Sequence, residues 1–131
     1  MQHKKILVLL MVSLITSSVI LVSCYKDKTV NVDAPAITRT VTFSQDIQPI
    51  FTKSCALSGC HSTGGQTPNL TSGAAYNSLI IGNYINKTSP EGSFIYLKMT
   101  GKKGTVMPVG GMNKDYNALI LAWIKQGANN N

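Results

Sequence analysis

The sequence has few of the residue types that build catalytic centres or large cores. Its 131 residues include five acidic residues, two histidines and three cysteines, with one Trp, five Tyr and three Phe. So few aromatic side chains predict a thin core, and small chains of this kind often need a disulfide, a metal or a cofactor to fold. Because it has no paired carboxylates and no Ser/His/Asp set, we expect no enzyme activity and no small-molecule substrate.

The N-terminal segment carries the marks of an export signal. Lys4 and Lys5 precede a mostly apolar run over residues 6–21, which is short for a membrane-spanning helix. A positive start followed by a short apolar run is typical of a secretory signal peptide. An uncleaved anchor helix is the alternative.

The end of this segment, Leu21-Val22-Ser23-Cys24, resembles the lipobox of bacterial lipoproteins. The resemblance implies cleavage before Cys24, lipidation of Cys24, and a signal peptide over residues 1–23. Several acyl chains give stable membrane anchoring. We therefore expect an exported protein held by lipid at a bacterial membrane, in the periplasm or outer membrane or at the cell surface. Nucleic acid is then an improbable partner, despite a net charge of +7.

The remaining chain divides into a tether and one domain. Residues 24–40 are polar and aperiodic, which indicates a tether. Residues 41–131 predict an all-α domain of about four short helices, since no run alternates as a strand would. The first helix should begin at Ser44 as N-cap and be disturbed by Pro49. A second helix is expected over residues 74–81, with Ser72 as its cap, and a third over residues 93–100. The segments between the helices, residues 62–72 and 101–111, should be loops.

The last helix has the clearest signals. Asn113 is placed to cap it, Lys125 falls in its last turn, and Gly127 follows where helices stop. An apolar stripe is expected at helical spacing, formed by Tyr116, Leu119, Ile120, Trp123 and Ile124.

The segment Cys55-Ala56-Leu57-Ser58-Gly59-Cys60-His61 concentrates the reactive side chains. Two thiols followed at once by a histidine resemble the c-type haem attachment motif, here in a longer C-x4-C-H form of the usual C-x2-C-H. The resemblance implies thioether bonds from Cys55 and Cys60 and an axial bond from His61. Gly59 would permit the bulge that two extra residues require.

Two other interpretations use the same residues. A zinc site lacks ligands, because structural zinc takes four and only one histidine lies outside the signal segment. A plain Cys55–Cys60 disulfide in an interaction lipoprotein is the other alternative.

Met107 is the predicted second axial ligand. Methionine commonly completes a His-ligated haem iron in electron-transfer proteins. Met107 precedes Pro108 in a glycine-rich loop before the last helix. Met112 is the stronger rival, whereas Met99, at the end of a predicted helix, is expected in the core.

Together these segments resemble a class I-like cytochrome c domain of exported proteins from Bacteroidetes-like and planctomycete-like bacteria. Beyond the haem motif, the resemblance rests on residues 43–51, 89–96, 107–108 and 122–128. It implies one covalent haem c and helices that cross near Phe51 and Trp123. Relatives often show Met-Pro-Pro where this chain has Met107-Pro108-Val109.

The expected function is one-electron transfer with a redox partner protein. An acidic partner would suit Lys98, Lys102 and Lys103, although these also fit an ordinary solvated face. Without Met107 as ligand, a five-coordinate haem would make a gas-binding or sensory module instead.

Overall fold

The computed structural model describes residues 36–131, and all of its regular elements are helical. The prediction of an all-α domain is therefore confirmed for this part of the chain, where no strand occurs. The predicted signal peptide, Cys24 and most of the predicted tether lie outside the described residues. In chain order the elements are η1 (Phe43–Ile47), α2 (Gln48–Ser54), α3 (Ala75–Ile81), η2 (Pro90–Gly92), α4 (Phe94–Met99) and α5 (Lys114–Lys125).

The first helix begins earlier than predicted and changes type along its length. Thr42, not Ser44, is the N-cap of η1, which is a π-helix. Asp46 explains the difference, because its carboxylate accepts the backbone N–H of Thr42 (2.8 Å) while its own N–H donates to the Thr42 carbonyl (3.1 Å). Pro49 lies in the first turn of α2, where its missing N–H is tolerated.

The two middle helices lie close to their predicted positions. The N-cap of α3 is Ala74 and has no side-chain cap, so the proposed cap at Ser72 is wrong. Helix α4 follows the short 3-10 helix η2, which the sequence analysis missed, and stops before Gly101 (φ +70°). Glycine adopts a positive φ at little cost, so Gly101 allows the chain to leave the helical conformation at the end of α4.

The predicted boundaries of α5 are confirmed, but its buried face differs somewhat from the predicted apolar stripe. The side chain of Asn113 accepts the N–H of Tyr116 (3.0 Å), as an N-cap should. Ile120, Trp123 and Ile124 are buried, whereas Tyr116 and Leu119 are only partly buried. Asn117, a polar residue outside the predicted stripe, is 2% exposed.

Four aromatic side chains form one cluster in the core, those of Phe43, Phe51, Tyr76 and Trp123. The ring of Phe43 lies 5.3 Å from Trp123, 5.4 Å from Tyr76 and 6.2 Å from Phe51, measured between ring centroids. Phe51 and Trp123 are both fully buried, and Phe43 packs between the elements that carry them. The ring of Phe43 thus connects Phe51 of α2 with Trp123 of α5, and the sequence analysis did not single it out.

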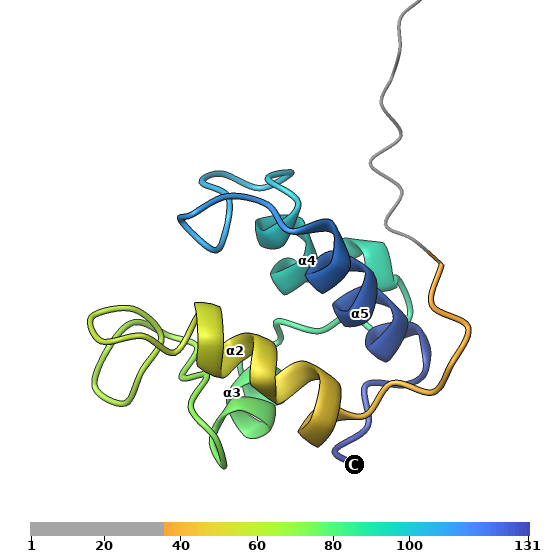
Figure 1. Ribbon diagram of the computed structural model, residues 1–131, viewed down its shortest axis with the longest axis horizontal. Helices are drawn as coiled ribbons and strands as arrows, with labels where there is room; N and C mark the ends of the chain where they lie inside the picture. Colours follow the sequence, from red (N-terminus) through yellow and green to blue (C-terminus); the bar gives the residue numbers. More distant parts are fainter. Residues whose placement is uncertain (1–35) are drawn as a thin grey trace, which may run out of the picture. The chain divides into compact units, whose positions relative to one another are not determined.

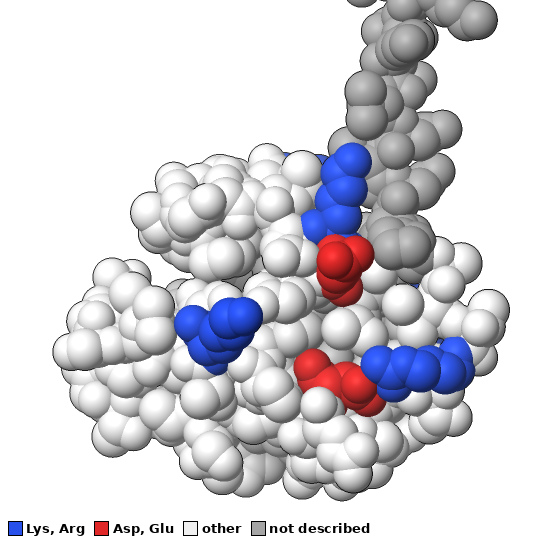
Figure 2. Space-filling view, viewed as in Figure 1, with Lys and Arg blue, Asp and Glu red and all other residues white. Residues whose placement is uncertain are grey.

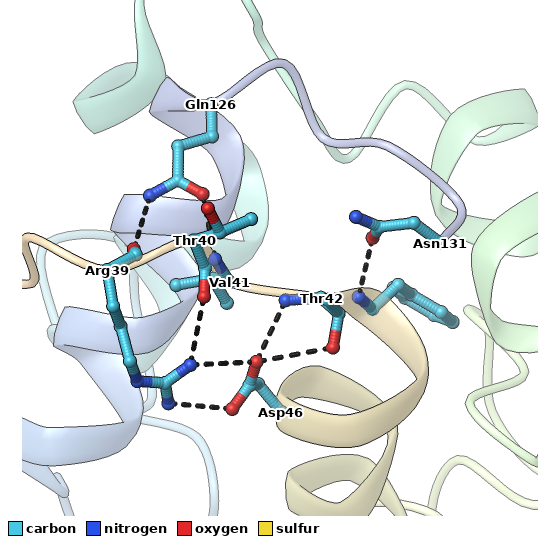
Figure 3. Close-up of polar contacts among 8 residues, drawn as sticks. Arg39, Thr40, Val41, Thr42, Asp46, Gln126 and Asn131 are labelled. Carbon is cyan, nitrogen blue, oxygen red and sulfur yellow. Dashed lines mark hydrogen bonds and ion pairs between the residues drawn. The ribbon is translucent and has the colours of Figure 1, made fainter.

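Polar contacts fasten the start of the described chain to helix α5 (Figure 3). We call this group the N-terminal clasp; its members are Arg39, Thr42, Asp46, Gln126 and Asn131. The Gln126 side chain accepts the N–H of Val41 (2.8 Å) and donates to the carbonyl of Arg39 (3.0 Å). Asn131 accepts the N–H groups of Phe43 and Ser44, both at 2.9 Å.

The clasp and the long loops lie at opposite ends of the domain (Figure 1). The segment before η1 and the C-terminal residues meet at one end, whereas the loops over residues 56–70 and 100–113 project at the other. The face in Figure 2 carries few charged side chains, in small separate groups on a mostly uncharged surface.

No helix within residues 36–131 is long and apolar enough to cross a membrane.

Asp46 makes the clasp sensitive to acid. Hydrogen bonds from Arg39 (2.7 and 3.1 Å) are the main reason that the pKa of Asp46 falls from 3.8 to about 2. Since the folded-state pKa is lowered, the carboxylate stabilises the fold above pH 3.8, and this contribution is lost as the pH falls through about 2.

We expect Asp46→Ala to lower the free energy of unfolding by about 1 kcal/mol at neutral pH, because the backbone N–H of Thr42 and the guanidinium of Arg39 lose their shared acceptor. Urea unfolding of both proteins between pH 2 and 7 measures the difference, which should shrink below pH 3.8. Asp115→Ala, in the first turn of α5, is the matched control. A difference that stayed constant down to pH 2 would contradict this role of Asp46.

Candidate functional site

The loop from Cys55 to His61 follows directly from the C-terminal end of α2. The N–H groups of Cys55 and Ala56 both donate to the carbonyl of Phe51, at 2.9 and 2.7 Å. The loop then returns on itself, because the N–H of His61 donates to the carbonyl of Cys55 (3.1 Å). Gly59 has φ +76° within this turn, which is the backbone freedom that the sequence analysis expected of it.

The His61 ring is oriented by two backbone carbonyls of the next loop. Its Nδ1 lies 3.1 Å from the carbonyl oxygen of Pro68 and 3.2 Å from that of Gln66. Because carbonyls only accept, Nδ1 carries the hydrogen, and Nε2 of the neutral ring keeps its lone pair. Backbone bonds from Gln66 to Cys60 (2.7 Å) and from Leu70 to His61 (2.8 Å) hold the surrounding loop.

His61 lines an open pocket of about 270 Å³ between α2, α4 and the loops. Cys55 and Met107 line it too, so three of the predicted site residues reach one cavity. Met99, which was expected in the core, also lines it. Cys60 is exposed and does not line the pocket. Most of the remaining lining is apolar, and includes Phe51, Leu70, Tyr84, Phe94 and Ile95.

The three candidate methionines have different surroundings. Met107 is partly buried and lines the pocket, and its N–H donates to the carbonyl of Lys98 at the end of α4 (3.0 Å). Met112 is 42% exposed and lies outside the lining. Met99 is 4% exposed; it belongs to the core, as expected, and also borders the pocket. Its spacing of four residues from Ile95 in α4 was the available signal that it faces inward.

Lys98 belongs to the pocket lining, and Lys103 lies close to the same ring, that of Phe94. The ammonium groups of Lys103 and Lys98 lie 4.8 and 5.9 Å from the centroid of the Phe94 ring. At such distances a cation is attracted to the ring face. Positive charge is therefore concentrated near the part of the pocket formed by α4.

The two thiols differ in environment. Both are free, with Cys55 partly buried and Cys60 exposed. Burial, with a smaller contribution from Cys60, raises the pKa of Cys55 from 9.0 to about 11.

No group of three or more His, Cys, Asp or Glu side chains gathers within residues 36–131.

Comparison with protein-family models, with curated proteins and with solved structures finds no match to this chain.

In the protein without cofactor, we expect Cys60 to react with iodoacetamide much faster than Cys55 at pH 8. The raised pKa leaves Cys55 with roughly a hundredfold less thiolate than an unshifted thiol. Peptide mass spectrometry over a time course measures both rates, and a urea-unfolded sample, in which the two thiols should react alike, is the control. Equal rates in the folded protein would contradict the assigned burial of Cys55.

Proposed function

We propose that this protein is a c-type cytochrome that carries single electrons and is anchored to a bacterial membrane by lipid. The observation that carries the proposal is the meeting of Cys55, His61 and Met107 in the lining of one apolar pocket. Met107 is separated from His61 by more than forty residues, so their convergence does not follow from the motif itself.

The residues present fit a covalently attached haem. Both thiols are free, and each would add across a vinyl group, with sulfur bonded to one carbon and hydrogen to the other, so that no oxidant is needed. The Nδ1 contacts of His61 leave Nε2 as the available ligand atom, and they orient the ring as metal-bound histidines require. The open pocket of about 270 Å³ would cover part of the group and leave an edge accessible.

When bound, the haem would supply an iron that cycles between ferric and ferrous states, and His/Met ligation raises its reduction potential. The chain's own contribution would be to hold the iron with His61 and Met107 and to exclude water with Phe51, Leu70 and Ile95.

A protein partner would exchange electrons at the pocket side of the domain. Lys98 and Lys103 place positive charge beside Phe94 in the lining, which favours an acidic partner surface.

The test is expression of the full-length chain with a cytochrome c maturation system. We expect an intact mass increased by one haem, a sharp reduced α-band, and a far-red ferric band typical of sulfur ligation. A colourless protein lighter by two hydrogens would instead establish the Cys55–Cys60 disulfide and overturn the proposal.

Replacing individual methionines identifies the sixth ligand. Met107→Leu should abolish the far-red band, lower the reduction potential, and allow the reduced protein to bind carbon monoxide. Met112→Leu is the matched control and should keep the band, because Met112 is outside the pocket. Met99→Leu tests the other methionine that borders the pocket, and it should also keep the band because the Met99 side chain is buried in the core. Wild-type protein that binds carbon monoxide readily would favour the gas-binding alternative.

The lipid anchor is tested separately at Cys24. We expect the wild-type chain to incorporate labelled fatty acid and to partition into the detergent phase with membranes. Cys24→Ser should lose the label and appear in the soluble fraction, because acylation needs the thiol. Equal labelling of both proteins would contradict lipidation at this residue.

A further inference from the structure

The amide of Asn117 is a buried polar group whose hydrogen bonding is incomplete. The residue is 2% exposed, in the first turns of α5. Its Nδ2 donates to the carbonyl of Met99 over 3.4 Å, and its Oδ1 has no partner among the described residues. An apolar side chain would avoid the cost of burying an unpaired amide oxygen, so the amide requires a physical explanation.

The bond from Asn117 gives the carbonyl of Met99, the last residue of α4, a hydrogen-bond donor. The last four carbonyls of a helix have no partner within it. In α4 the carbonyl of Tyr96 accepts the N–H of Thr100 (2.9 Å), and that of Leu97 accepts the N–H of Lys103 (3.2 Å).

The last two carbonyls of α4 connect to the site and to α5. The Lys98 carbonyl accepts the N–H of Met107 (3.0 Å), and the Met99 carbonyl accepts the side-chain amide of Asn117. The Lys98 carbonyl also accepts the N–H of Gly101 (3.3 Å), so the last turn of α4 has backbone bonds of its own. The same turn connects the side-chain bond from Asn117 in α5 to the backbone bond of Met107.

We propose that Asn117 is a positioning residue for Met107, acting through the last turn of α4. This inference rests on the proposed function, in which the sulfur of Met107 is an iron ligand. Asn117 itself does not line the pocket, so its effect passes through the carbonyls of Met99 and Lys98.

The test compares Asn117→Leu with wild type as matured, haem-containing full-length proteins. Leucine has a similar size but cannot donate to the Met99 carbonyl. Added imidazole competes with Met107 for the ferric iron, and loss of the far-red band reports the exchange. We expect half-displacement at about a fivefold lower imidazole concentration in Asn117→Leu, the effect of losing one modest hydrogen bond.

Ile120→Val is the matched control, because it loosens the buried face of α5 without removing a hydrogen bond. It should lower global stability and leave the imidazole midpoint unchanged. An unchanged midpoint in Asn117→Leu, or equal shifts in both variants, would overturn the inference. Wild-type protein that acquires no haem would overturn the proposed function, and this inference with it.

Hydrogen exchange in the wild-type holoprotein gives a second test that needs no variant. If Asn117 holds the turn, the Met107 amide and the Asn117 side-chain amide should exchange through one opening, with the same dependence on urea. The indole N–H of Trp123, bonded to the carbonyl of Asn129 (2.9 Å), should remain protected during this opening. Exchange of Met107 while the Asn117 amide stays protected would show that the residues are not coupled.

Discussion

The ring of Phe43 joins three helices at the centre of the domain. It packs against Phe51 in α2, Tyr76 in α3 and Trp123 in α5. With so few aromatic residues in the chain, this cluster supplies a large share of the available apolar contact area. The position of α2, and therefore of the Cys55–His61 loop that follows it, depends on this packing. The candidate site thus depends on a cluster that does not itself contain the reactive side chains.

The two sides of the candidate site are held by different means. His61 is oriented by carbonyls of the loop that follows it, at Gln66 and Pro68, so its environment is local in sequence. Met107 is held by the carbonyl of Lys98, and the end of α4 is held in turn by Asn117. The histidine side is therefore built within one loop, whereas the methionine side requires α4 and α5 to pack together.

The loops over residues 56–70 and 100–113, which contain His61 and Met107, project at the end of the domain away from the C-terminal residues (Figure 1). Arg39 and Thr42, at or next to the predicted tether boundary, are bonded to the first helix and to α5. Under the proposed lipid anchoring, the chain leaves the domain at the end away from the loops over residues 56–70 and 100–113. A partner could then reach the pocket without displacing the clasp.

The sequence by itself was sufficient for the all-α class, the extent of α5 and the nearness of Cys55 and His61, because these depend on local spacing, capping and turn residues. It misplaced the caps at Ser44 and Ser72, because Asp46 accepts the N–H of Thr42 and makes Thr42 the N-cap, and because α3 begins without a side-chain cap. The sequence favoured Met107 over Met112, but only the tertiary structure showed Met107 in one pocket lining with Cys55 and His61, and only it buried Asn117. Those outcomes depend on contacts between distant segments, which periodicity along the chain does not encode.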